Sequence, residues 1–79
     1  MKELKKLALI LRALGLPAAY VDEVDSQFVD IRQGKVWMCV WYDGKGYEVH
    51  LFYSEKCVYD NCYFDSQIEV IREISDYIH

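Results

Sequence analysis

Residues 28–53 read FVDIRQGKVWMCVWYDGKGYEVHLFY, and this stretch decides the fold. β-Branched and aromatic residues dominate it, and two turn signals interrupt it, Gln33-Gly34 and Asp43-Gly44-Lys45-Gly46. β-Branched and aromatic residues favour strands, and short interruptions that contain Gly and Asp favour tight turns. The stretch therefore predicts three antiparallel strands, near Phe28 to Arg32, Lys35 to Tyr42 and Tyr47 to Tyr53.

The lengths of the two turns predict the register of these strands. A two-residue loop at 33–34 would pair Arg32 with Lys35 and place Val29 and Ile31 beside Met38 and Val36. A loop joining Tyr42 to Tyr47 would pair Val40 with Val49 and Met38 with Leu51.

Both registers put the same side chains on one sheet face, because strand side chains alternate. The uncharged face must pack against the helices, and it holds Val29, Ile31, Val36, Met38, Val40, Val49, Leu51 and Tyr53. The opposite face is aromatic and mixed in charge, with Phe28, Asp30, Arg32, Trp37, Cys39, Trp41, Glu48, His50 and Phe52.

Outside this stretch, an apolar stripe predicts a helix over about Lys2 to Leu14, with Leu4, Leu7, Ala8, Leu11 and Leu14 on one face and Leu9 and Ile10 widening it. Gly15 and Pro17 end this helix. We expect Pro17 to Gln27 to be a short turn or connector.

The C-terminal third predicts one short strand and a second helix. A fourth strand is expected around Cys57 to Tyr59, with Asp60-Asn61 as a turn. Ser66 followed by Glu69 fits a capping box, and the helix after it would bury Ile68, Ile71, Ile74 and Ile78. The predicted fold is a single α+β domain over residues 1–79: a helix, a three- or four-stranded antiparallel meander and a helix, with both helices on one sheet face.

Composition narrows the classes of partner. The chain has 79 residues and a net charge of -4, but the first fourteen residues carry +3 and the remainder -7. An acidic body repels phosphate backbones, so direct nucleic-acid binding is disfavoured and a protein partner with a basic surface is favoured. No apolar run approaches the ~20 residues of a membrane span. The basic start imitates a signal peptide, but Arg12 and the missing cleavage site argue against one, so we expect a cytoplasmic protein.

Motifs for chemistry are sparse. The element order resembles that of double-stranded RNA-binding domains, but that family has a basic cluster where this chain has Asp65, Ser66, Gln67, Ile68 and Glu69, so its activity is not carried over. The registers place Cys39 opposite His50, and with Cys57 and Cys62 they could bind zinc, but the spacing does not fit common zinc sites. We expect reduced thiols, no catalytic residues, no metal and no cofactor.

The aromatic residues carry the functional hypothesis. The expected partner-binding residues are those of the outward face: Trp37, Trp41, Phe52 and Phe28, with Asp30, Arg32, Glu48 and His50 at the rim. Against this, residues 17–27 or 54–64 could fold over that face and bury it. In size, charge and lack of motif the chain looks like the stand-alone inhibitors of phages and mobile elements, including anti-CRISPR proteins.

The sequence therefore predicts a non-enzymatic, acidic protein-binding module, in the manner of an inhibitor that covers a basic surface of its target. One alternative is a homodimeric structural or assembly protein that pairs through the aromatic face. Another is a thiol- or zinc-dependent switch that uses Cys39, Cys57, Cys62 and His50.

Overall fold

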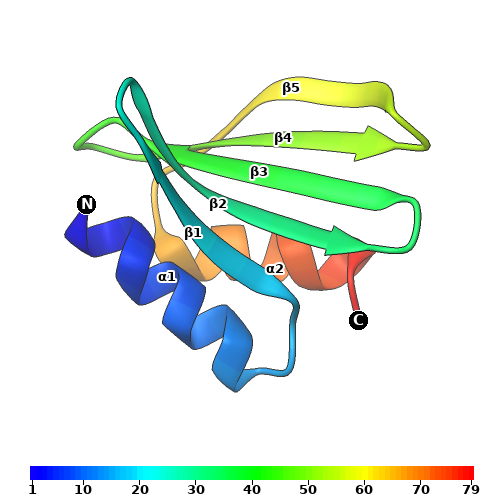
Figure 1. Ribbon diagram of the computed structural model, residues 1–79, viewed down its shortest axis with the longest axis horizontal. Helices are drawn as coiled ribbons and strands as arrows, with labels where there is room; N and C mark the ends of the chain where they lie inside the picture. Colours follow the sequence, from blue (N-terminus) through cyan, green and yellow to red (C-terminus); the bar gives the residue numbers. More distant parts are fainter.

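The computed structural model describes residues 1–79 and shows two helices packed on one antiparallel sheet (Figure 1). The sheet has five strands in the order β1-β2-β3-β4-β5, so every strand pairs with its neighbour in sequence. The elements are α1 (Lys2–Ala13), β1 (Ala18–Glu23), β2 (Ser26–Gln33), β3 (Val36–Tyr42), β4 (Tyr47–Tyr53), β5 (Lys56–Phe64) and α2 (Gln67–Tyr77). The α+β class and the antiparallel meander are confirmed, whereas the predicted count of three or four strands is wrong.

The edges of the sheet are β1, which was not predicted, and β5, which was predicted only as a short strand. Residues 17–27, predicted to be a connector, instead contain β1, which pairs with β2 from Ala18 to Glu23. The predicted short strand near Cys57 is the nine-residue β5, and residues 60–61 lie inside it rather than in a turn. Register shifts between β4 and β5 accommodate these polar residues, as β-bulges do at sheet edges.

The central hairpin has the predicted register. Tyr42 pairs with Tyr47, Val40 with Val49 and Met38 with Leu51. The hairpin of β2 and β3 does not have the predicted register. Gln33 pairs with Val36, so the two-residue turn is Gly34-Lys35. Val29 therefore lies opposite Val40, and Ile31 opposite Met38. The shift is two residues, and a shift by an even number leaves every side chain on its predicted face.

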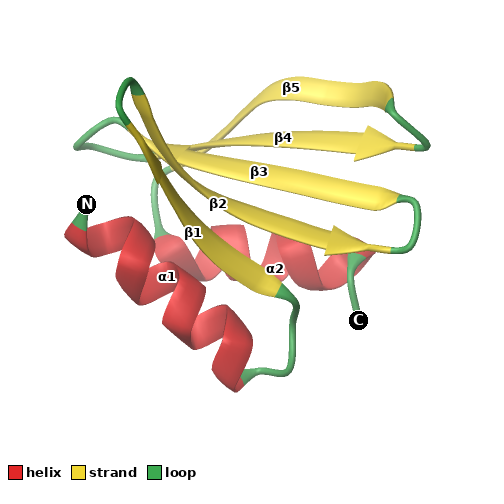
Figure 2. Ribbon diagram, viewed as in Figure 1, coloured by secondary structure: helices red, strands yellow, loops and turns green.

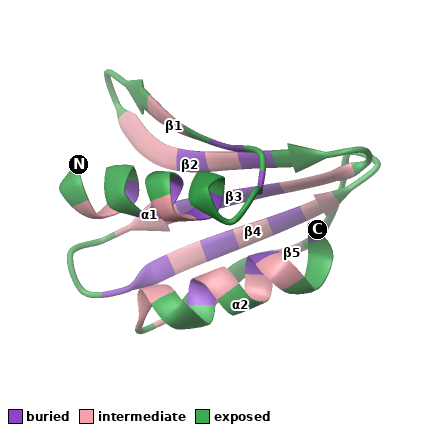
Figure 3. Cartoon of the chain, turned by 90° about the horizontal axis from the view of Figure 1, so that it is seen from below, coloured by how far each residue is buried: buried purple, intermediate pink, exposed green.

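The inward face of the sheet and the two helices form one hydrophobic core (Figure 3). Helix α1 contributes Leu4, Leu7, Ala8 and Leu11, and α2 contributes Val70 and Ile74. Most of the predicted inward-facing residues are buried, including Val29, Ile31, Met38, Val40, Val49 and Leu51. Tyr53 is an exception at 54% exposed, because it lies at the end of β4 next to the turn.

The helix ends follow their local sequence signals. Gly15 takes a left-handed φ of 84°, and the amides of Gly15 and Leu16 bond back to the carbonyls of Arg12 and Leu11. This is the Schellman arrangement, which turns Leu16 into the core and leaves Leu14 exposed, contrary to its predicted burial. At α2, the Ser66 hydroxyl accepts the amide N–H of Glu69, as the predicted cap requires.

Two further core assignments on the helices are wrong. Leu9 and Ile68, predicted to belong to the apolar stripes, are 62% and 63% exposed. In α2, Val70 is buried in place of Ile68, so the stripe is Val70, Ile74 and Ile78 with Ile71 partly buried. Both exposed residues lie outside the sheet face described next, and they serve below as control positions.

Candidate protein-binding face

Both helices lie on the same side of the sheet, and no element covers the other side (Figure 2). Segments 17–27 and 54–64, which could have folded over that side, extend the sheet at its two edges instead. We call the uncovered side the outer face. The pairing places on it all eight predicted partner-binding residues, namely Phe28, Asp30, Arg32, Trp37, Trp41, Glu48, His50 and Phe52.

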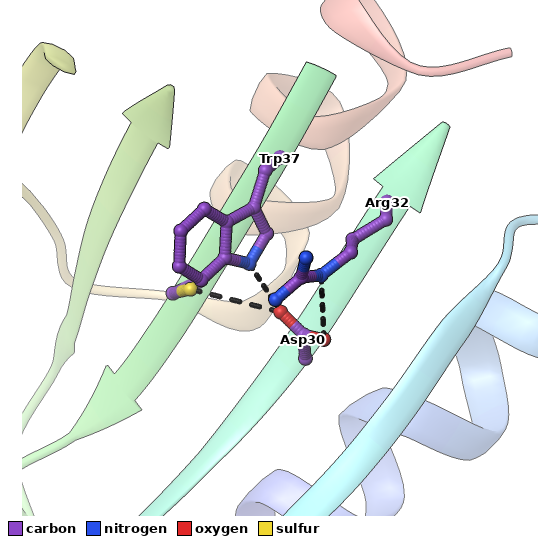
Figure 4. Close-up of polar contacts among 4 residues, drawn as sticks. Asp30, Arg32 and Trp37 are labelled. Carbon is purple, nitrogen blue, oxygen red and sulfur yellow. Dashed lines mark hydrogen bonds and ion pairs between the residues drawn. The ribbon is translucent and has the colours of Figure 1, made fainter. Parts of the chain in front are cut away.

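One half of the outer face is organised around the Asp30 carboxylate (Figure 4). The Trp37 indole N–H donates to Asp30 Oδ1, and Arg32 Nε donates to Asp30 Oδ2 at 3.3 Å. The Arg32 guanidinium lies over the Trp37 ring, 4.3 Å from its centroid, and Trp37 stacks on Phe52 at 4.8 Å. Arg32, Trp37 and Phe52 therefore form a continuous stack across β2, β3 and β4.

The other half is organised around Trp41. Its indole N–H donates to the Ser26 hydroxyl at 3.1 Å. The centroid of its ring lies 5.2 Å from that of Phe28 and 4.6 Å from that of His50. His50 Nε2 contacts Glu48 Oε2 at 2.8 Å. The two tryptophans are thus fixed in orientation by hydrogen bonds at one edge and by aromatic neighbours at the other.

These contacts decide how the outer face can be used. All four large aromatic side chains are half-buried, so part of each ring remains open to solvent. Both indole N–H groups are already bonded within the chain, as is each rim carboxylate. Burying the two indole N–H groups therefore costs little, because each already has an acceptor within the chain. The aromatic centre of the face can thus be covered by another surface without leaving an indole donor unpaired.

The arrangement around Cys39 differs from the one needed for a catalytic or metal-binding thiol. Cys39 does pair with His50, as the register predicted. However, the Cys39 thiol donates to Asp30 at 3.8 Å, while His50 is bound to Glu48, so the two side chains are directed to different carboxylates. All three cysteines are free thiols, and no group of three or more His, Cys, Asp or Glu side chains is placed to hold a metal ion. The zinc-dependent alternative thus lacks an assembled set of ligands.

Burial and the nearby Asp30 carboxylate raise the pKa of the Cys39 thiol to about 12, well above the usual value of ~8.5. The folded protein therefore holds this proton above pH 8.5, where an unfolded chain releases it. The resulting stabilisation is fully present below about pH 8.5 and is lost as the pH rises toward 12.

We predict that the unfolding free energy falls between pH 8 and pH 9.5 in the wild type and falls less in Cys39→Ala, as measured by urea denaturation. Thiol labelling with mass spectrometry provides a second readout. The exposed Cys57 should react in the folded protein, and Cys39, at 2% exposed, should react only on unfolding. Labelling of Cys39 at the rate of Cys57 would contradict this description.

Sequence reasoning missed the outer-face residues that come from the edge strands. Pairing places Ala19, Val21 and Glu23 of β1 on this face, and also Cys57 and Tyr63 of β5. The Tyr63 hydroxyl donates to Asp43, whose carboxylate also accepts the amides of Lys45 and Gly46 and so has a pKa below its usual range. The sequence of β1, AAYVDE, does not alternate between apolar and polar residues, so no period-two signal marked this strand.

A groove of about 350 Å³ opens where the outer face meets the β2–β3 and β4–β5 turns. Arg32, Lys35, Trp37, Ser54 and Glu55 are among the residues that line it. Ser54 and Glu55 form the β4–β5 turn with φ of 52° and 69°, a left-handed conformation that non-glycine residues seldom adopt. The groove thus combines an indole with two cations and one carboxylate.

No helix of the chain is both long and apolar enough to span a membrane. Comparisons with protein-family models, with curated proteins and with solved structures gave no match.

Proposed function

We propose that this chain is a non-enzymatic, acidic protein-binding module whose outer face packs against a partner protein. The observation that carries the proposal is the set of four half-buried aromatic rings on a sheet face that no element of the chain covers. Fixed Trp rings beside Arg are the groups that contribute most to binding when a partner excludes water from them. An aromatic patch that stays partly open to solvent on an uncovered sheet face is typical of an interaction surface.

The charge distribution favours a partner with basic groups at its contact surface. The cations of the first fourteen residues lie on α1, which is on the side away from the outer face. The end of β1 carries Asp22 and Glu23, and the turns that follow β1 and β3 carry Asp25 and Asp43. Opposite charge across an interface increases the association rate and selects the partner. An inhibitor that covers a basic surface, of the kind that phages encode, is one form of such a module, and a self-associating subunit is another.

Site-specific photocrosslinking tests the proposal. A photoreactive phenylalanine analogue at position 52 should crosslink to the partner in extracts of the cells that produce the protein. The same analogue at position 9, an exposed apolar position on α1, is the matched control. We expect a crosslinked product from position 52 that is absent from position 9. Crosslinking from position 9 alone would place the binding surface on the helices and overturn the proposal.

A further inference from the structure

The groove contains a guanidinium that is held in place but has unused donors. Arg32 bonds to Asp30 through Nε alone, and its two terminal nitrogens make no hydrogen bond within the chain. The bond from Nε to Asp30 and the cation–π contact with Trp37 together hold the guanidinium over the indole ring, so these donors are restrained in position. Lys35 lines the same groove, and Glu55 is its one carboxylate. Free, oriented donors next to an indole fit a carboxylate with an apolar neighbour.

The β1–β2 turn has the complementary chemistry. It consists of Val24 and Asp25, and Glu23 precedes it. Val24 is 97% exposed, the highest value among the large apolar side chains, and both acidic neighbours are also exposed. We call residues 23–25 the acidic tip. The Val24 side chain, flanked by the carboxylates of Glu23 and Asp25, is therefore not packed against any other part of the chain.

The acidic tip and the groove lie at opposite ends of β2. This strand runs from Ser26 to Gln33, with the tip just before it and Gly34-Lys35 just after it. Its eight residues span roughly 27 Å at ~3.4 Å per residue. When two copies face each other with their β2 strands antiparallel, each tip lies at the end where the other copy has its groove.

We propose that the partner of the outer face is a second copy of this chain, with the acidic tip of each copy in the groove of the other. This inference rests on the proposed function, because it takes the outer face as the binding surface and adds the identity of the partner. A two-fold axis makes both tip contacts equivalent and closes the assembly at two copies. The aromatic rings of the two outer faces then pack in the middle, between the two charged contacts.

Charge reversal with mixing tests the arrangement. Asp25→Lys and Lys35→Glu each place like charges at both tip contacts of their own homodimer. Mixed together, these two variants form a heterodimer in which both contacts again join opposite charges. In the homodimer of the double variant Asp25→Lys/Lys35→Glu, the introduced lysine of each copy meets the introduced glutamate of the other, so both tip contacts again join opposite charges. Asp60→Lys, an exposed charge reversal on β5, is the control.

Mass in solution should show a wild-type dimer, measured by light scattering and analytical ultracentrifugation. Each single variant should dimerise at least about tenfold more weakly, since like charges at a contact are costly. The equimolar mixture and the double variant should regain the dimer, and Asp60→Lys should match the wild type. Single variants that dimerise normally, or a mixture that fails to recover, would overturn the tip-in-groove arrangement.

A wild-type chain that is monomeric up to millimolar concentration would overturn this inference alone. The proposed function would then be judged by the crosslinking from position 52, which detects any protein partner. A monomer that still crosslinks to a different protein through position 52 separates the two outcomes. A monomer that shows no crosslink from position 52 contradicts both.

Discussion

Replacing Trp37 and Trp41 together by alanine will abolish binding to the partner and leave a folded domain. Truncating a Trp at the centre of an interface costs ~2 kcal/mol or more, so the pair should weaken association by about a thousandfold. Each ring is half-buried, so its loss should destabilise the fold by less than the ~3–5 kcal/mol of a fully buried Trp. Circular dichroism and thermal melting check the fold, and titration with the partner checks the binding.

The matched control is Leu9→Ala with Ile68→Ala. Both residues are more than 60% exposed and lie on the helices, so the double change removes apolar surface away from the outer face. It should leave both the melting temperature and the affinity close to those of the wild type. If the tryptophan variant unfolds outright, the indoles belong to the core, and the outer face cannot be a binding surface.

Placing an aspartate at Leu51 or at Phe52 will have opposite consequences, although the two positions are adjacent in β4. Leu51 is 3% exposed and packs in the core, where an unpaired carboxylate costs several kcal/mol. For a domain of this size, the total stability is only ~5–15 kcal/mol, so Leu51→Asp should be largely unfolded at 37 °C.

Phe52 lies on the outer face, stacked on Trp37, and it is partly open to solvent. Phe52→Asp should therefore remain folded, with a moderate loss of stability, and should fail to bind the partner. Urea denaturation of the two variants side by side measures the difference. Equal destabilisation would mean that the two sheet faces are equally buried, contrary to the arrangement in which both helices pack on one side.

The central strands could be predicted because their pattern is unambiguous. β3 and β4 alternate between inward aliphatic residues and outward aromatic or charged ones, and the Asp43 turn fixes their register. The register error at Gln33 arose because Gln33-Gly34 and Gly34-Lys35 are both plausible two-residue turns. It did not alter the outer face, since a shift by two residues preserves the alternation.

β1 could not be predicted from propensity, and only the short segment around Cys57 to Tyr59 of β5 could. β1 contains Asp22 and Glu23 and follows Pro17, and β5 contains Asp60 and Asn61, all of them residues that disfavour strands. At an edge such residues are tolerated, because one side of the strand is unpaired and charges there discourage aggregation. The groove could not be predicted from the sequence either, because its lining residues come from the β2–β3 turn and the β4–β5 turn, which are about twenty positions apart.

Fluorescence quenching tests the central claim most directly, because the only two tryptophans of the chain both lie on the outer face. Acrylamide should quench both indoles in the isolated chain, when it is diluted until no partner is bound, and should quench them much less in the complex. Indoles that resist quenching in the isolated chain would show that the face is already covered. Equal quenching in the isolated chain and in the complex would show that the partner binds elsewhere.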